Sequence, residues 1–189
     1  LFDLRGRLGY AEVVEMGRQV ADGLGHLHRS GWLHGDVKPG NVLVEQDRVI
    51  VIDLGLARAS GRYDDPFGTQ WYLSPEQADR RPVAEAIDVW GLGLLLLESA
   101  SGRDAFPPGC KEYRPEHGPL AAPPARRFPR AVPAELVELI MNCTAFDPGA
   151  RPALSEVSVV LNKLADATRG DKHQGGLRKF AFRPVSRRQ

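Results

Sequence analysis

The sequence predicts a mostly α-helical fold that carries small β-hairpins. Three stretches place apolar residues at helical spacing, namely residues 13–27, 134–144 and 153–167. A further run, from Asp88 through Leu97, is apolar on all sides after its first residue, which is typical of a buried helix. Two aliphatic runs, residues 42–44 and 48–52, flank a short polar turn and predict a hairpin. Helices therefore dominate, with one small sheet among them.

The first helix is indicated by a continuous apolar stripe. Its members are Val13, Met16, Gly17, Val20, Leu24 and Leu27. Gly31 follows as a C-terminal stop signal. His26 and His28, near the end of this helix, are interpreted as surface or packing residues and not as ligands.

The hairpin predicts a pair of oxygen ligands at its open end. Asn41 and Asp53 are equally far from Asp47 in the turn, so we expect them to be near neighbours across the ladder, about 4.5–5.5 Å apart at Cβ if they pair directly. An amide oxygen and a carboxylate are hard ligands. They suit Mg²⁺, which takes one or two protein ligands and keeps waters or phosphate oxygens.

A loop just before the hairpin supplies Asp36 and Lys38. Two carboxylates about 5 Å apart repel by roughly 3 kcal/mol at an effective dielectric near 20, so a cation has to offset them. Lys38 and a bound metal would do so. Of these four side chains, one can then accept a proton, two can hold metal and one can neutralise phosphate. Together they suit phosphoryl transfer.

Ordered motifs along the chain resemble those of eukaryotic-type serine/threonine protein kinases, here of a bacterial kind. They are His34-Gly35-Asp36-Val37-Lys38-Pro39-Gly40-Asn41 for the catalytic loop, Asp53-Leu54-Gly55 for D-F-G, Ser74-Pro75-Glu76 for A-P-E, Asp88-Val89-Trp90-Gly91-Leu92-Gly93, and Asp147-Pro148-Gly149-Ala150-Arg151-Pro152. The resemblance implies the C-terminal lobe of a kinase over residues 1–168, with the catalytic loop at 34–41 and the activation segment at 53–76.

The resemblance also implies a role for each matching residue, with ATP and Mg²⁺ as cofactors and a protein Ser or Thr hydroxyl as acceptor. Asp36 would act as the catalytic base, and Lys38 would stabilise the γ-phosphoryl group of ATP. Asn41 and Asp53 would hold Mg²⁺, and Thr69 would position the substrate. The residues expected to support the frame are His34, Glu76, Asp88 and Arg151, with Glu76 and Arg151 as a buried ion pair.

Gly35 departs from the family, in which most members carry arginine that pairs with a phosphorylated residue of the activation segment. We therefore expect activation that does not depend on that switch. His-Gly-Asp also occurs in aminoglycoside and choline phosphotransferases, which share the kinase architecture. A small-molecule phosphotransferase is therefore an alternative, although Lys38 and the stretch 68–76 favour a protein kinase.

The motifs of the N-terminal lobe are missing from this sequence. No G-x-G-x-x-G precedes a strand, and no V-A-I-K lysine is present. We expect weak or no turnover from these residues alone unless a missing N-terminal lobe or a partner completes the site. A second alternative follows, a non-catalytic pseudokinase or scaffold made of one lobe. The intact Asp36, Lys38, Asn41 and Asp53 argue against it.

Composition sets the remaining expectations. The 189 residues are 42% hydrophobic with a net charge of +1, which suits one globular domain and makes nucleic acid an improbable partner for the whole chain. Residues 169–189 hold seven Arg or Lys against one Asp and are interpreted as a basic tail or linker. The two cysteines lack metal-ligand spacing, so we expect reduced thiols and a cytoplasmic protein. No apolar run is long enough to span a membrane.

Overall fold

The computed structural model describes residues 8–45, 48–102, 105 and 132–170. In chain order its elements are α1 (Tyr10–Arg29), β1 (Val42–Glu45), β2 (Arg48–Val51), α2 (Pro75–Ala78), α3 (Ala86–Ser101), α4 (Ala134–Cys143) and α5 (Leu154–Gly170), with short 3-10 turns at Pro39–Asn41, Leu54–Leu56, Gln70–Tyr72 and Pro148–Ala150. The fold is mostly helical with one two-stranded antiparallel sheet, as the sequence predicts.

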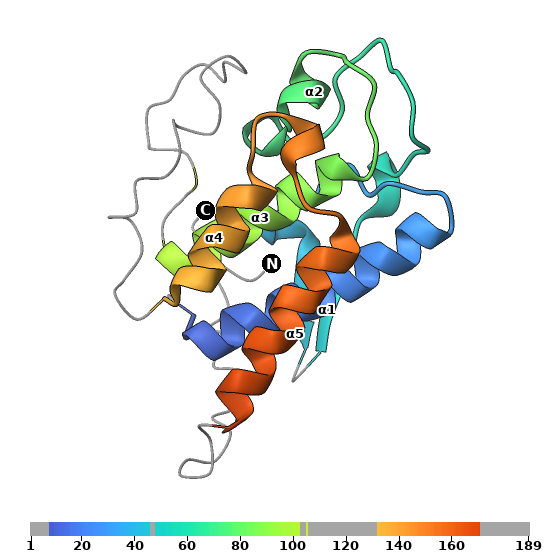
Figure 1. The fold of residues 1–189 in the computed structure, drawn as a ribbon. Helices are drawn as coiled ribbons and strands as arrows, with labels where there is room; N and C mark the ends of the chain where they lie inside the picture. Colours follow the sequence, from blue (N-terminus) through green and yellow to red (C-terminus); the bar gives the residue numbers. More distant parts are fainter. Residues whose placement is uncertain (1–7, 46–47, 103–104, 106–131, 171–189) are drawn as a thin grey trace, which may run out of the picture.

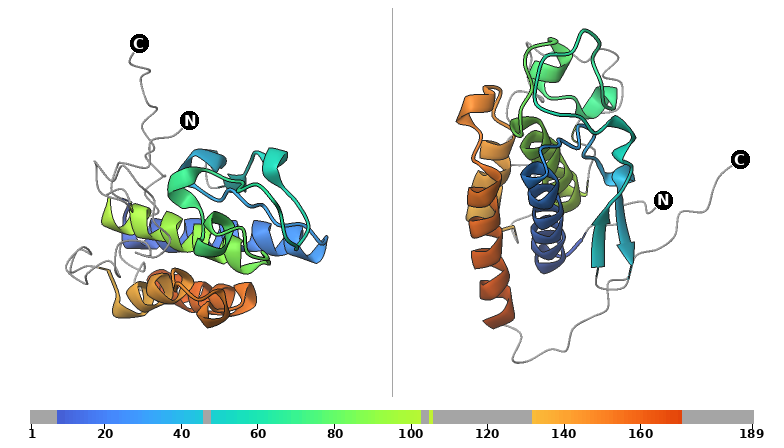
Figure 2. Two further views of the ribbon diagram at one scale, coloured as in Figure 1. Left: turned by 90° about the horizontal axis from the view of Figure 1, so that it is seen from above. Right: turned by 90° about the vertical axis from the view of Figure 1, so that its right-hand side faces the viewer.

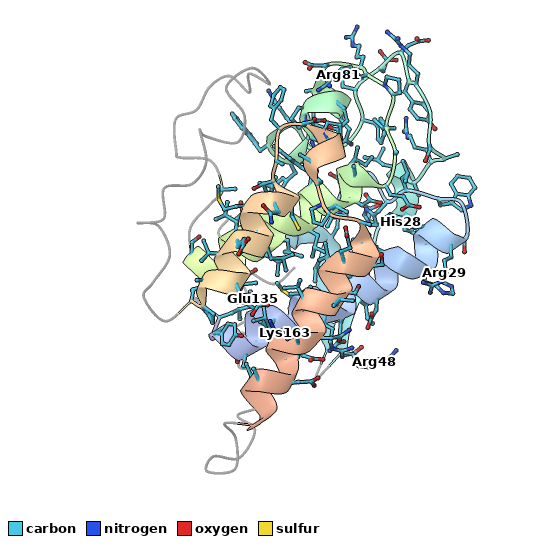
Figure 3. All side chains as sticks on the ribbon, in the orientation of Figure 1. His28, Arg29, Arg48, Arg81, Glu135 and Lys163 are labelled. Carbon is cyan, nitrogen blue, oxygen red and sulfur yellow. The ribbon has the colours of Figure 1, made fainter. Side chains whose placement is uncertain are left out.

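The elements form three layers (Figures 1 and 2). Helices α1 and α3 make the middle layer, α4 and α5 cover one of its sides, and the hairpin β1–β2 packs against α1 on the other. The loops that join the hairpin to α2 and α3 lie together at one end of this stack. On the outside, Lys163 of α5 donates to Glu135 of α4 at 2.8 Å (Figure 3).

Helix α3 is the centre of the core. Every residue from Ile87 to Leu97 is buried, which explains why its sequence lacks a polar face. Two of its glycines allow close approach. A Cβ on Gly91 would lie 2.8 Å from the carbonyl oxygen of Val37 in the catalytic loop, and one on Gly93 would lie 2.7 Å from the Cβ of Cys143 in α4. The catalytic loop therefore rests directly on the backbone of α3.

The structure of α1 confirms the predicted apolar stripe and the predicted end of the helix. It buries Val13, Met16, Val20 and Leu24 among other residues and finishes at Arg29. Gly31 then adopts φ +82°, in the left-handed region that glycine enters without steric cost. The chain turns there, and the residues that follow lead into the catalytic loop.

The hairpin forms where predicted, but its register corrects one expectation. Val42 pairs with Val51, so the pairing is centred between residues 46 and 47 and not on Asp47. Asn41 is therefore opposite Ile52, whose N–H donates to the Asn41 carbonyl at 2.9 Å. Asp53 lies one residue beyond that partner. The placement of the turn centre at Asp47 was therefore wrong by half a residue, and Asn41 and Asp53 are offset by one position instead of paired directly.

Some sequence predictions lie outside the described residues. Helix α5 continues through Gly170, past the predicted start of the basic tail, and residues 171–189 are not among those described. Cys110 also lies outside them, whereas Cys143 is buried with a free thiol. Burial raises the pKa of Cys143 to about 12, although the Arg151 charge acts against this. Among the described helices, none is both long and apolar enough to cross a membrane.

The close contact at Gly91 predicts a large effect of a single methyl group. Gly91→Ala should reduce the free energy of unfolding by roughly 1–3 kcal/mol, because the Cβ has no space against the Val37 backbone. Gly23→Ala in α1 is the matched control. Its Cβ would meet only Val51 Cγ2, at 3.7 Å, so higher helix propensity should stabilise it by about 0.5–1 kcal/mol. Urea unfolding measures both, and equal effects would contradict the packing at Gly91.

Candidate active site

The catalytic loop is held by one buried carboxylate. Asp88, in the first turn of α3, is fully buried and accepts hydrogen bonds from the backbone N–H groups of His34 and Gly35, each at 2.8 Å. His28 of α1 approaches the same carboxylate through Nε2, also at 2.8 Å. Asp88 thus satisfies three donors from two segments, which is what a carboxylate buried away from water requires. The predicted structural role of Asp88 is consistent with this geometry.

His34 connects the loop to the end of β2. Its ring is fully buried, and its Nε2 lies 3.1 Å from the carbonyl oxygen of Ile52. Because a carbonyl can only accept, Nε2 carries the hydrogen, and Nδ1 accepts the N–H of Asp36 at 3.3 Å. The histidine therefore sets the distance between the loop that carries Asp36 and the strand that leads to Asp53.

Four of the predicted site residues form one hydrogen-bonded cluster. Lys38 Nζ donates to Asp36 Oδ2 at 2.6 Å and to the hydroxyl of Thr69. The Thr69 N–H donates to Asp36 Oδ1 at 2.8 Å. Asn41 Nδ2 donates to Asp36 Oδ2 at 3.0 Å and to the Asp36 carbonyl at 2.8 Å. Residues from the catalytic loop and from the activation segment thus meet at a single carboxylate.

This cluster keeps Asp36 ionised. Burial alone would raise the pKa of the Asp36 carboxyl, but hydrogen bonds from Lys38 and Thr69, together with the Lys38 charge, outweigh it and lower the pKa below its ordinary value of 3.8. At neutral pH the group is therefore a carboxylate with a fixed orientation. Such a group can accept a proton from a hydroxyl held beside it.

Asp53 has the backbone of a strained turn. It is one of two non-glycine residues with positive φ among those described, at φ 66° and ψ 72°, and it is exposed. Its Oδ1 accepts the Gly55 N–H at 3.3 Å. Asparagine and aspartate tolerate this region best, and a residue held there by its surroundings often belongs to a functional site. The Nδ2 of Asn41 donates to Asp36, so Oδ1 is the Asn41 atom that can bind a cation.

Glu76 and Arg151 form the predicted buried ion pair. Arg151 Nη1 and Nη2 donate to the two carboxylate oxygens of Glu76 at 2.6 and 2.8 Å, and both side chains are at most 2% exposed. The remaining Arg151 donors reach the carbonyls of Ala86, Ala145 and Phe146. Because every donor is used, removing one partner would leave a buried charge uncompensated, at a cost of about 3–5 kcal/mol.

Several residues that hold this site were not found from the sequence. Gln77 Nε2 donates to the carbonyls of Gly35 and Phe67, at 2.9 and 3.0 Å, and so links the catalytic loop to the activation segment. Arg58 lies over the Phe67 ring, 3.8 Å from its centre. His28, interpreted as a packing residue, is a direct partner of Asp88. No local pattern marks these residues, because their partners lie far away in the sequence.

Gly35 is where the chain departs from the kinase pattern, and Phe67 occupies the adjacent space. Gly35 has φ +76°, and a Cβ there would lie 2.6 Å from Phe67 Cε2. Phe67 is buried and makes an edge-to-face contact with Tyr63, with ring centres 5.3 Å apart. Arg58, Tyr63 and Phe67 therefore form an aromatic–cation stack beside the position where other family members have arginine.

A family model described as "Protein kinase domain" matches residues 3–160, which is most of the chain. The chain belongs to the protein kinase family. Its fold also resembles a solved kinase structure, PK-1 of the Cydia pomonella granulovirus. The TM-score is 0.69 at 26% identity, over 80% of this chain and 58% of that one.

Bacterial relatives carry the names of serine/threonine kinases. The chain is 35% identical over 157 residues to serine/threonine-protein kinase PkaA of Streptomyces coelicolor, covering 78% of this chain and 28% of that protein. It is 33% identical over 171 residues to PknA of Corynebacterium glutamicum, covering 87% of this chain and 36% of that protein. The chain thus spans about a third of the length of these relatives or less.

The environment of Asp36 predicts a measurable pKa change. Lys38→Met removes a hydrogen bond and a positive charge from the carboxylate, so the pKa of Asp36 should rise. In the unchanged protein the stability that Asp36 contributes is present above its unfolded pKa and is lost as pH falls through its lowered folded pKa. In Lys38→Met the folded pKa lies closer to the unfolded pKa, so this loss should be smaller and should be complete at a higher pH.

The carboxyl ¹³C shift of Asp36, followed by NMR against pH, measures this change. Lys163→Met removes an exposed lysine that pairs with Glu135, and it should leave the Asp36 titration unaltered. If Asp36 titrates alike in the unchanged protein and in Lys38→Met, Lys38 does not hold its pKa down.

Proposed function

We propose that this chain is the catalytic lobe of a serine/threonine protein kinase, which transfers the γ-phosphoryl group of ATP to a Ser or Thr hydroxyl of a protein. The observation that carries this proposal is the Asp36 carboxylate, kept ionised and oriented by Lys38, Asn41 and Thr69. Membership of the protein kinase family and the names of the relatives support the same reaction.

In this mechanism Asp36 accepts the proton of the substrate hydroxyl. The hydroxyl oxygen forms a bond to the γ-phosphorus while the bond from that phosphorus to the β–γ bridging oxygen breaks, and ADP leaves. Lys38 donates to Asp36, and its charge would also stabilise the negative charge of the phosphoryl group during transfer. Thr69, on the activation segment, ties this pair to the surface on which a substrate residue would lie.

Asn41 and Asp53 would hold Mg²⁺. Their donor chemistry fits, because an amide oxygen and an exposed carboxylate provide the hard oxygen ligands that Mg²⁺ takes from proteins. The ion, when bound, neutralises charge on the phosphate oxygens of ATP. Asn41 also donates to Asp36, so one side chain positions both the base and a ligand of the metal.

The site is completed by a further lobe, either of the same polypeptide or of a partner. Ile52 and Leu54, on either side of Asp53, are 39% and 54% exposed and provide apolar surface beside the metal ligand for such a lobe to cover. The chain also matches only a fraction of the length of its kinase relatives. The cytoplasmic location and the absence of a nucleic-acid partner stay predictions.

The function is tested by phosphoryl transfer in the native protein from its own source. The protein is incubated with Mg²⁺ and ATP labelled at the γ-phosphate, with a mixture of proteins as acceptors. Label should appear on Ser and Thr, and Asp36→Asn should lower the rate about 10²–10⁴-fold, as loss of a general base does. Asp79→Asn, an exposed carboxylate that pairs with Arg81, is the matched control and should retain the rate.

Other outcomes of the same assay would replace the proposal. Transfer to aminoglycosides or choline, and not to proteins, would indicate a small-molecule phosphotransferase. An absence of transfer to any acceptor, with an intact fold, would leave the non-catalytic scaffold. A normal rate in Asp36→Asn would contradict the assignment of the base.

We further expect activity that does not require phosphorylation of the activation segment, because Gly35 offers no cation and the stack of Arg58, Tyr63 and Phe67 holds the segment. Ser60→Ala, and Tyr63→Phe, which keeps the ring, should change the rate by about twofold at most. Thr69→Ala is read separately, since Thr69 contacts Lys38. Phosphate found by mass spectrometry at Ser60 or Tyr63, together with loss of activity in that variant, would contradict this expectation.

A further inference from the structure

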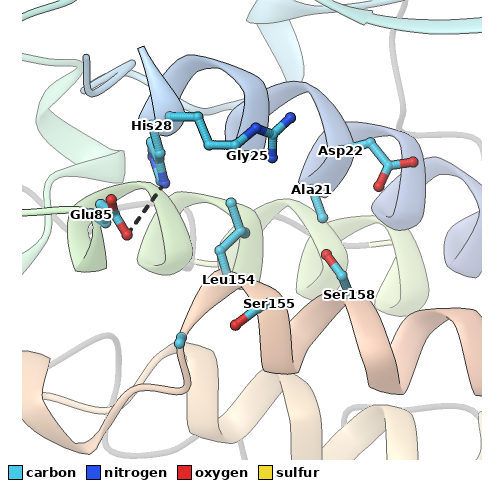
Figure 4. A pocket seen from close by; sticks show the side chains of 10 residues that line it. Ala21, Asp22, Gly25, His28, Glu85, Leu154, Ser155 and Ser158 are labelled. Carbon is cyan, nitrogen blue, oxygen red and sulfur yellow. Dashed lines mark ion pairs between the residues drawn. The ribbon is translucent and has the colours of Figure 1, made fainter. Parts of the chain in front are cut away.

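A cleft with mixed polar and apolar lining lies between the last turns of α1 and the starts of α3 and α5 (Figure 4). Its volume is about 440 Å³, within the range of small-molecule sites in proteins. His28 and Asp22 line it from α1, Glu85 from the start of α3, and Leu154 and Ser158 from α5. None of these residues belongs to the phosphoryl-transfer site.

His28 lines this cleft and has a ring nitrogen that is itself buried and has no hydrogen-bond partner among the described residues. Its Nε2 lies 2.8 Å from Asp88 Oδ2, and because that carboxylate accepts, Nε2 carries the hydrogen. In a neutral ring Nδ1 is then an acceptor, and no hydrogen-bond partner for it exists among the described residues. The side chain is only 5% exposed. A buried polar atom without a partner carries a desolvation cost, so such atoms are rare and call for a physical reason.

The group that faces this nitrogen is also an acceptor. Glu85 Oε2 lies 3.8 Å from His28 Nδ1, which is too far for a hydrogen bond (Figure 4). Two acceptors that face each other need a donor between them. Either a second proton on the imidazole or a donor from a ligand would supply it.

Glu85 is the carboxylate that a cationic donor would meet in the cleft. Asp22 also lines the cleft, but it already pairs with Arg18 at 3.0 Å, and Arg29 lies along α1, with its Nη1 3.4 Å from the position of a Gly25 Cβ. Ala21 and Leu154 provide apolar surface beside the charged groups, and Ser155 and Ser158 provide hydroxyls. An alkyl chain that ends in a cationic donor matches this combination.

We propose that this cleft binds a guanidinium or primary ammonium group, which donates to Glu85 and to His28 Nδ1 together. The bound group would contact His28, which is the neighbour of the carboxylate that holds the catalytic loop. His28 hydrogen-bonds Asp88, and Asp88 holds the N–H groups of His34 and Gly35. The binding itself does not depend on phosphoryl transfer, so it is tested apart from the proposed function.

The test uses n-butylguanidinium as the probe and n-butylurea, its neutral counterpart, as the control ligand. Binding is followed by ¹⁵N NMR of the histidine side chains, with the His28 signals assigned from a His28→Gln variant. Butylguanidinium should shift the His28 Nδ1 signal in a saturable manner, and butylurea should not.

Substitutions of the charged residues that line the cleft test whether it selects a positively charged ligand. Glu85→Gln should weaken binding of the cation about threefold to fivefold, the range for an exposed ion pair. Arg29→Gln should strengthen it, because a like charge is removed. Glu135→Gln, an exposed carboxylate paired with Lys163, is the matched control and should have no effect. N-acetylarginine amide distinguishes two sources of the natural cation. If it binds more tightly than butylguanidinium, the natural ligand is an arginine side chain of a protein. If it binds more weakly, the natural ligand is a free small cation.

Any of four results would overturn the proposal. Hydrogen on both ring nitrogens of free His28 would mean that a second proton already satisfies the site. Equal shifts with butylguanidinium and butylurea, or unaltered binding in Glu85→Gln, would mean that Glu85 and His28 do not recognise a cation. Weaker binding in Arg29→Gln would mean that the cleft does not select positive charge.

Discussion

The hydrogen bonds that Asp88 accepts are the constraint on which the candidate site depends. A carboxylate at 0% exposure in the middle of a protein is costly unless donors surround it. Here the donors are two consecutive N–H groups of the catalytic loop and the ring of His28. Helix α3 fixes the carboxylate, and the carboxylate fixes the loop. The position of Asp36, one residue further along, follows from that attachment.

Close backbone contacts complete the attachment. The loop can reach α3 because Gly91 leaves room for the carbonyl of Val37, and it can reach the activation segment because Gly35 leaves room for Phe67. Gln77 then bridges the same two segments through carbonyl groups. The loop is thus held from both sides by contacts that tolerate no extra atoms. Such packing holds Asp36, Lys38 and Thr69 in one arrangement.

The sequence predicts the parts of this structure that depend on local patterns. The helices follow from apolar periodicity, and the pair Asp36 and Lys38 lies two residues apart in one loop. The partner Thr69 follows only from the resemblance to kinases, since 31 residues separate it from Lys38. The hairpin register was wrong by one position, because the centre of a short turn decides the pairing and the sequence allowed more than one centre.

Contacts between distant segments could not be predicted from the pattern of either segment. His28 and Asp88 are 60 residues apart, and Gln77 and Gly35 are 42 residues apart. Each residue has an ordinary role in its own helix, so its partner appears only when the layers are assembled. The cleft beside His28 is of the same kind, because α1, α3 and α5 each contribute a part of it.

The most direct test of the role of Asp88 is hydrogen exchange at the backbone amides of His34 and Gly35. Both amides should exchange slowly in the unchanged protein. Asp88→Asn should speed them at least about tenfold, because a hydrogen bond to a charged group is worth about 1.5–3 kcal/mol. The amide of Leu95 in α3 should stay protected, which shows that the fold is intact. Fast exchange of His34 and Gly35 in the unchanged protein, or equal rates in both proteins, would contradict the central role of this carboxylate.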